Sequence, residues 1–166
     1  MGSVEILGSD TPLVGAISTS EATLTNRTVS NLGASACLSA DQSISSASVT
    51  HVALDATGFD DESEFDTTNN EFTAADAGIY YVTAAALWDS PGSNTEIRSL
   101  IQVSGVETAV ERVVTGNNGN QSCSITTVEE LSAGDTVSWN VRQDSGGSVD
   151  IFGNAQSTYM QIIHLG

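Results

Sequence analysis

The chain has 166 residues, 39% hydrophobic and 15% charged, so its composition predicts one folded domain rather than a disordered segment. Twenty-one acidic residues stand against four basic ones, all arginines (Arg27, Arg98, Arg112 and Arg142), for a formal net charge of -17. This balance argues against nucleic acid as a direct partner, because phosphate binding depends on many clustered basic residues. The absence of a long apolar run argues against a membrane-spanning segment.

The acidic excess also predicts the solvent in which the protein works. At ordinary ionic strength a domain with this charge is destabilised by repulsion between its own carboxylates. In molar salt the Debye length falls to about 3 Å, so the carboxylates hardly repel one another and serve to hold water and cations. The composition therefore predicts a halophilic source, with an ordinary acidic secreted protein as the alternative.

Residues 1–45 are rich in serine, threonine, alanine and glycine and show no helical period. We expect them to form an extended arm that binds a partner, ahead of a head domain at 46–166. The first residues include Glu5 and Asp10 and no basic residue, unlike the basic start of a secretory signal peptide. We therefore expect a protein that is made without such a signal.

Short apolar runs after residue 46 are separated by turn-forming residues, which is typical of a β-sandwich or barrel. Apolar and polar residues alternate over 136–142, so one face of that strand is expected in the core and the other in water. The segments 79–88 and 159–165 are instead largely apolar on both faces. Since an antiparallel sandwich normally exposes one face, we expect other copies of the subunit to cover these strands.

Three motifs follow one another between residues 72 and 165. An aromatic residue, a short turn and a Gly-x-Tyr sequence occur as Phe72, Gly78 and Tyr80. A Leu-x-x-Gly-Asp-x-Val strand opening occupies 131–137, and an aromatic final strand occupies 158–165. In order and spacing the three motifs resemble the complement globular-head and tumour-necrosis-factor superfamily.

That resemblance implies an all-β fold, a ten-stranded jelly-roll β-sandwich that assembles as a homotrimer. It also implies that Tyr159, Gln161 and Ile163 of the last strand face the threefold axis, with Tyr81 as their neighbour. Gln161 departs from the small residue that is usual in the superfamily's last strand. No collagen repeat precedes the domain, which removes complement-type function from consideration.

Candidate catalytic groups are few. The two histidines, His51 and His164, are not near a nucleophile motif such as Gly-x-Ser-x-Gly, so we expect structural roles for them. Paired catalytic carboxylates of the kind used by glycoside hydrolases are not recognisable either. We therefore expect a protein that is not an enzyme and that uses no cofactor.

An acidic cluster comprises Asp60, Asp61, Glu62, Glu64 and Asp66. Carboxylates are ligands of calcium, but the cluster lacks the glycine and the terminal glutamate of a calcium-binding loop. A solvated acidic loop is the expected structure, with calcium binding as the alternative. No metal site is predicted.

Two further residue pairs have two interpretations each. Cys37 and Cys123 do not have the spacing of a metal site, so they are expected to be buried free thiols, with a disulfide as the alternative. Asn26 and Asn120 begin Asn-x-Ser/Thr acceptor sequences for glycosylation. Chains rich in serine and threonine also contain this tripeptide by chance.

The function that combines these expectations is structural. A virion protein is assembled inside the cell and needs no signal peptide, so we expect a trimeric capsid decoration or turret component on a virus of a halophilic archaeon. The arm would bind capsid or other virion proteins and the heads would face the salty medium. A receptor-binding knob of a tail fibre, recognising host glycan or surface-layer protein, is one alternative. A secreted glycan-binding jelly-roll domain is another, and neither nucleic acid nor membrane is expected as a partner.

Overall fold

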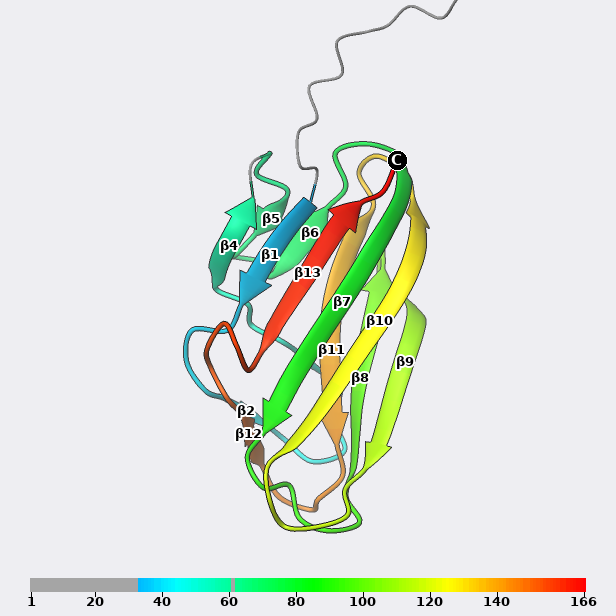
Figure 1. Cartoon of the computed structure of the whole chain (residues 1–166). Helices are drawn as coiled ribbons and strands as arrows, with labels where there is room; N and C mark the ends of the chain where they lie inside the picture. The colour runs from blue at the N-terminus through cyan, green and yellow to red at the C-terminus, as the bar shows by residue number, and fades with distance from the viewer. Residues whose placement is uncertain (1–32, 61) are drawn as a thin grey trace, which may run out of the picture.

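The computed structural model describes residues 33–60 and 62–166, and within them every regular element is a β-strand. Two antiparallel sheets face each other across the core (Figure 1). Sheet A contains β1 (Gly33–Cys37), β2 (Gln42–Ile44), β4 (Ala56–Asp60), β7 (Gly78–Trp88), β10 (Gln121–Leu131), β12 (Val149–Ile151) and β13 (Tyr159–His164). Sheet B contains β3 (Thr50–His51), β5 (Phe65–Asp66), β6 (Glu71–Thr73), β8 (Glu96–Val103), β9 (Val106–Val114) and β11 (Thr136–Gln143).

The expected all-β sandwich is confirmed, but the described residues form thirteen strands rather than the expected ten. Five of the strands, β2, β3, β5, β6 and β12, have only two or three residues. In the first part of the chain the backbone takes positive φ angles at Ala47, Ser63 and Asn70. Few residues other than glycine adopt this conformation, which interrupts an extended strand. The segment 42–73 is therefore divided into short strands.

The head begins earlier than the expected boundary at residue 45. Strand β1 lies inside sheet A, where it pairs with β13 on one side and with β4 on the other (Figure 1). Ala34 and Ala36 of β1 and Ile44 of β2 belong to the hydrophobic core. Residues 33–45 are thus part of the folded head, and the rest of the predicted arm, residues 1–32, lies outside the described residues.

The core between the sheets explains the first of the three motifs. Phe72 of β6 and Tyr80 of β7 are fully buried, and their rings meet edge to face at a centroid distance of 5.8 Å. The Tyr80 hydroxyl donates a 2.8 Å hydrogen bond to the carbonyl oxygen of Asp76 in the turn between them. The spacing of this motif therefore brings Phe72 of sheet B into contact with Tyr80 of sheet A, and this contact joins the two sheets.

Strand β11 matches its predicted alternation on one face only. Val137, Trp139 and Val141 are fully buried, as expected. The expectation that the polar face meets water is wrong for Ser138 and Asn140, which are only 6% and 7% exposed. Strand β11 is flanked by β8 on one side and by β3 and β6 on the other, so longer side chains on its neighbours surround these short ones.

Candidate functional site: the uncharged face of sheet A

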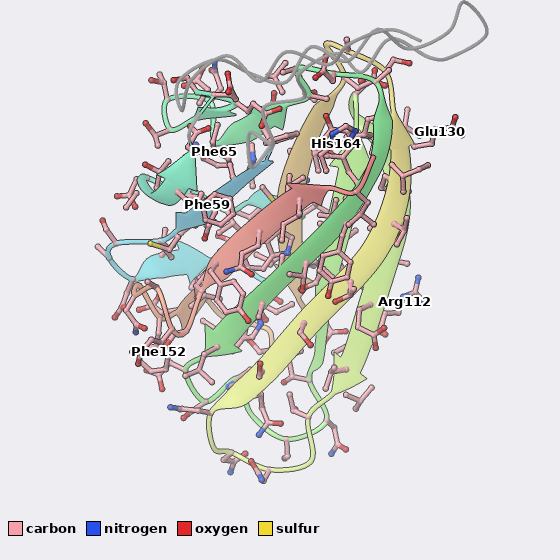
Figure 2. All side chains as sticks on the ribbon, turned by 45° about the horizontal axis from the view of Figure 1, so that its top comes forward. Phe59, Phe65, Arg112, Glu130, Phe152 and His164 are labelled. Carbon is pink, nitrogen blue, oxygen red and sulfur yellow. The ribbon has the colours of Figure 1, made fainter. Side chains whose placement is uncertain are left out.

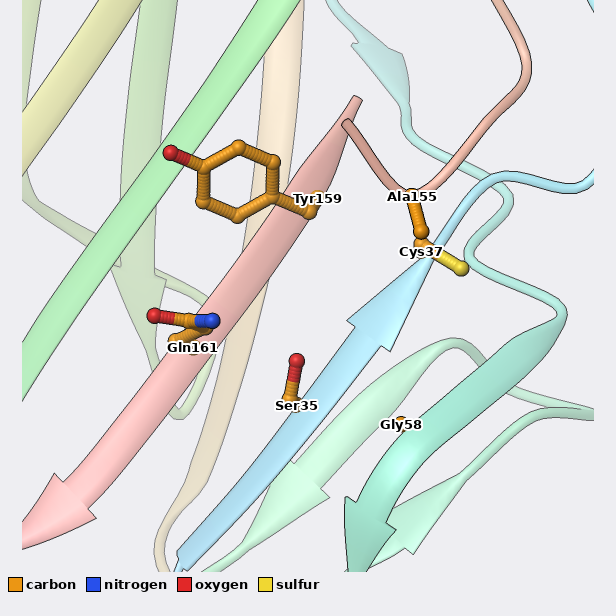
Figure 3. A pocket seen from close by; sticks show the side chains of 6 residues that line it. All are labelled: Ser35, Cys37, Gly58, Ala155, Tyr159 and Gln161. Carbon is orange, nitrogen blue, oxygen red and sulfur yellow. The ribbon is translucent and has the colours of Figure 1, made fainter. Parts of the chain in front are cut away.

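The four residues predicted at a subunit interface lie together on one face of sheet A. In the pairing of β13 with β7, Ile163 lies opposite Tyr81, and Gln161 lies opposite Thr83. Tyr159 is two residues before Gln161 and projects from the same face of β13 (Figure 3). Whether this face meets a threefold axis stays a prediction, because a single subunit is described.

This face continues over the neighbouring strands and is almost free of charge. The pairings of β1, β13, β7 and β10 put Ser35, Gln161, Thr83 and Thr126 in one row across the sheet. We call the outward side of these strands the neutral face. Its residues are Ser35, Cys37, Tyr159, Gln161, Ile163, Ile79, Tyr81, Thr83, Ala85, Leu87, Ser122, Ser124, Thr126 and Val128.

One charged residue, Glu130, follows this set at the end of β10, opposite Ile79 (Figure 2). Most of the 21 acidic residues of the chain are thus outside the neutral face. Exposed apolar side chains gather on the same face: Val128 is 58% exposed, Ile163 42% and Ile79 38%. A surface that is apolar and uncharged within so acidic a protein is the kind of patch that marks a protein interface.

Strands β7 and β13 were predicted to be covered on both faces, and the structure confirms this for their inward faces. Val82, Ala84, Ala86 and Trp88 of β7 are fully buried between the sheets. On β13, Met160 and Ile162 also face the core. The opposite faces, with the residues of the neutral face, are half-buried or exposed in the single subunit, so they are available for a further layer.

A shallow hollow of about 130 Å³ lies at one side of the neutral face. It is lined by Ser35 and Cys37 of β1, Gly58 of β4, Tyr159 and Gln161 of β13, and Ala155 of the preceding loop (Figure 3). The lining offers a hydroxyl, a thiol, an amide and a phenol ring. The hollow has the size of a single side chain rather than of a cofactor, so it suits a contact between proteins.

The two histidines do not form a catalytic group in the described residues. The Nε2 atom of His51 lies 3.0 Å from the carbonyl oxygen of Asn70, so His51 joins β3 to the turn before β6. His164 stacks on the ring of Tyr80 at a centroid distance of 4.6 Å. Both histidines thus have structural positions, as the sequence predicted.

The acidic cluster, apart from Asp61, which lies outside the described residues, is more ordered than the expected solvated loop. Asp60 accepts hydrogen bonds from the backbone N–H groups of Glu64 and Phe65. Asp66 accepts one from the N–H of Thr68, a bond that lowers the pKa of its carboxyl group. Among the described residues, no group of three His, Cys, Asp or Glu side chains is arranged to hold a metal ion.

Glu64 is the member of this cluster whose role the sequence did not indicate. It is 4% exposed, and its carboxylate accepts hydrogen bonds from the N–H of Gly33 at 2.6 Å and from the N–H of Ala75 at 3.0 Å. The carboxylate therefore holds the start of β1 against the turn between β6 and β7. A solvated loop is the wrong description for this residue, because its charge is satisfied by backbone donors inside the fold.

The structure also shows where the two cysteines and one of the two glycosylation sequences lie. Cys37 and Cys123 are free thiols as expected, but only Cys123, on the inward side of β10, is buried; Cys37 is partly exposed because it lies on the outward side of β1. Burial raises the pKa of the Cys123 thiol, which keeps it protonated and unreactive. Asn120 is exposed in the loop before β10, so its modification stays a prediction, and Asn26 lies outside the described residues.

Sequence reasoning missed two of the four strands of the neutral face. Strand β10 was not singled out, although Ser122, Ser124 and Thr126 alternate with the buried Cys123 and Ile125. That period-two pattern was a usable signal. Strand β1 was assigned to the arm because its sequence, GASAC, contains none of the large β-branched or aromatic residues that indicate strands.

Among the described residues, no helix is long and apolar enough to cross a lipid bilayer. No protein-family model matches the chain, and no curated protein sequence matches it significantly. The fold, in contrast, matches many solved structures with high confidence.

Three of these structures show what the fold resembles. Eiger, a tumour necrosis factor from S. frugiperda, has a TM-score of 0.63 and 13% identity, with 82% of this chain and 93% of that chain covered. Murine APRIL has a TM-score of 0.62 and 14% identity, with 80% and 99% covered. The globular domain of zebrafish complement 1qA has a TM-score of 0.60 and 14% identity, with 81% and 98% covered. The chain therefore has the tumour-necrosis-factor-like jelly-roll fold, as its three motifs predicted.

Proposed function

We propose that this protein is a non-enzymatic structural subunit that forms a homotrimer through the neutral face. The trimer works in concentrated salt as a capsid decoration or turret component on the surface of a virus of a halophilic archaeon. Residues 1–32 bind capsid or other virion proteins, and the jelly-roll heads face the medium.

The observation that carries the homotrimer is the distribution of charge. Residues of four adjacent strands form an uncharged and partly apolar surface, although the chain has a net charge of -17. On the exposed surface of a halophilic protein, carboxylates are favourable because they hold water and cations. The neutral face has no carboxylate, and the nearest one along β10 is that of Glu130. Burial against identical faces explains both the missing charge and the exposed Val128 and Ile163.

The experiment is a charge substitution on the neutral face. Tyr159→Asp puts a carboxylate at each of three facing positions, where it would have to be buried near two like charges. Light scattering in molar sodium chloride should give the mass of three subunits for the natural protein and of one for the variant. Val49→Asp is the matched control, since Val49 is 54% exposed outside the neutral face, and it should stay trimeric. A natural protein that is monomeric in molar salt contradicts the proposal.

The virion location rests on the acidic composition and has its own test. Antibodies against the head, followed by electron microscopy of particles from a halophilic culture that produces this protein, should label a regular array over the capsid. Labelling at the tail tip would favour the tail-fibre knob instead. Protein found only free in the medium would favour the secreted glycan-binding domain.

A further inference from the structure

Three of the four arginines of the chain are neighbours in the folded protein. In the pairing of β11 with β8, Arg142 lies directly opposite Arg98, and in the pairing of β8 with β9, Arg98 lies directly opposite Arg112. The three form one row across sheet B. We call this set the arginine row.

The arginine row lies on the outward side of sheet B. The residues that alternate with it along the strands face the core: Ile97 on β8 and Val141 on β11 are core residues, and Val113 on β9 is partly buried against the core. Arg112 is exposed and points away from β9 at the margin of the molecule (Figure 2). Since the neutral face belongs to sheet A, the arginine row stays accessible when sheet A is covered by other subunits.

This arrangement does not stabilise the sheet. Like charges directly opposite each other on neighbouring strands are destabilising. Within the described residues, the ion pairs of the row involve one carboxylate: Glu96 contacts Arg98 and lies 3.9 Å from Nη1 of Arg142. In the same part of the chain Arg112 has no ion pair, although acidic residues are abundant. Positive charge has been gathered here at a cost to stability.

The carboxylates near the row lie on one side of it. Glu96 and Asp144, whose carboxylate accepts the N–H of Glu96 at 2.7 Å, lie toward one edge of the row. On the other side, two residues along each strand, are the uncharged Asn140, Leu100 and Val110. Arg112 is exposed and has no ion pair in the described structure, so the row keeps a positive charge that an anionic ligand can balance.

We propose that the arginine row binds the sulfate or carboxylate groups of an acidic polysaccharide. Guanidinium groups bind such oxyanions through two parallel hydrogen bonds, and neighbouring strands place the backbones of the three arginines about 5 Å apart. These contacts act at hydrogen-bond distance and so persist where the Debye length is only about 3 Å. The row crosses the strands, whereas a peptide added to the edge strand β9 would run along them. This direction favours a polysaccharide over an acidic peptide.

The test compares binding of four polymers in molar sodium chloride: sulfated dextran, polygalacturonate, uncharged dextran and polyglutamate. The natural protein should bind sulfated dextran or polygalacturonate, and whichever binds more tightly identifies sulfate or carboxylate as the preferred group. Arg112→Gln and Arg142→Gln should each weaken that binding about tenfold, as expected for losing one charge-assisted contact. Both variants keep the contact between Glu96 and Arg98.

The control is Asn118→Asp, which changes the net charge by the same amount in the loop before β10. Its carboxylate can still accept the N–H of Ser93, as the amide oxygen does, so the loop is kept and binding should not change. Because Arg112 is exposed and the substitution removes its repulsion with Arg98, Arg112→Gln should melt no lower than the natural protein, which separates binding from folding. Equal binding by the natural protein and the arginine variants, no binding to either acidic polysaccharide, or tighter binding to polyglutamate would overturn the proposal. These results are independent of the trimer mass.

Discussion

At the residue scale, Glu64 shows how the fold uses a carboxylate in its interior. Its two backbone donors, Gly33 and Ala75, are far from each other in the sequence: Gly33 begins β1, and Ala75 lies in the turn after β6, the strand that pairs with β5. Hydrogen bonds to a charged group are stronger than those between neutral groups. Glu64 therefore connects the start of sheet A to the turn that leads into β7.

The first prediction concerns this residue. Glu64→Gln replaces one carboxylate oxygen by an amide nitrogen, which cannot accept a hydrogen bond, so one backbone N–H is left unsatisfied. We expect the free energy of unfolding to fall by about 1–3 kcal/mol, measured by urea denaturation at constant salt. Glu62→Gln, an exposed change in the same loop, should have no effect. Equal stabilities of the two variants would show that Glu64 does not hold these segments together.

The second prediction concerns the contact of Gly78 with His164. A Cβ atom at residue 78 would lie 2.1 Å from Nε2 of His164, so the imidazole would have to leave its position on Tyr80. Gly78→Ala should lower the free energy of unfolding by about 1–3 kcal/mol, the usual range for overpacking. In the double variant with His164→Ala the clash is absent, so the two effects should be less than additive in a double-mutant cycle. Strict additivity would contradict this explanation.

At the same scale, sequence reasoning identified contacts only where a motif linked neighbouring segments. Phe72, Gly78 and Tyr80 were singled out from their spacing, and their contacts now explain it. The role of Glu64 and the row of Arg98, Arg112 and Arg142 depend on strand pairing between distant parts of the chain. Register of this kind is determined by the whole sheet and is not written in local composition.

At the element scale, the long strands were predictable and the short ones were not. Strands β7, β11 and β13 have clear period-two or doubly apolar patterns and were expected within one or two residues of their observed bounds. Strand β1 consists of small residues, and its position between β13 and β4 comes from pairing rather than from its own side chains. A weak local signal was overridden by tertiary context.

The third prediction follows from the position of β1. Deleting residues 1–40 removes a strand from the middle of sheet A and leaves β13 and β4 without their shared neighbour. We expect this truncation to lose cooperative thermal unfolding. Deleting residues 1–32 leaves every described strand intact and should keep the transition. If the shorter protein that lacks residues 1–40 folds normally, then β1 is not a necessary part of the head.

At the scale of the whole molecule, added salt should favour association in two ways: it screens the repulsion between acidic subunits, and it strengthens apolar burial at the neutral face. A homotrimer would carry three times the subunit charge of -17, and at about 0.1 M salt the Debye length of about 10 Å lets neighbouring subunits repel each other. The neutral face gains from apolar burial, which sulfate and similar salts strengthen further. Dilution of salt should therefore weaken association before it weakens the fold.

The most direct test of this account is a sodium chloride series that follows mass by light scattering and stability by thermal melting. The account predicts three subunits and the highest melting temperature in molar salt, with loss of trimer mass and a lower melting temperature as salt falls toward about 0.1 M. The loss of mass should come at a higher salt concentration than the loss of folded structure. A trimer mass and a melting temperature that do not change over the series would contradict the salt adaptation, and the mass of one subunit in molar salt would contradict the role of the neutral face.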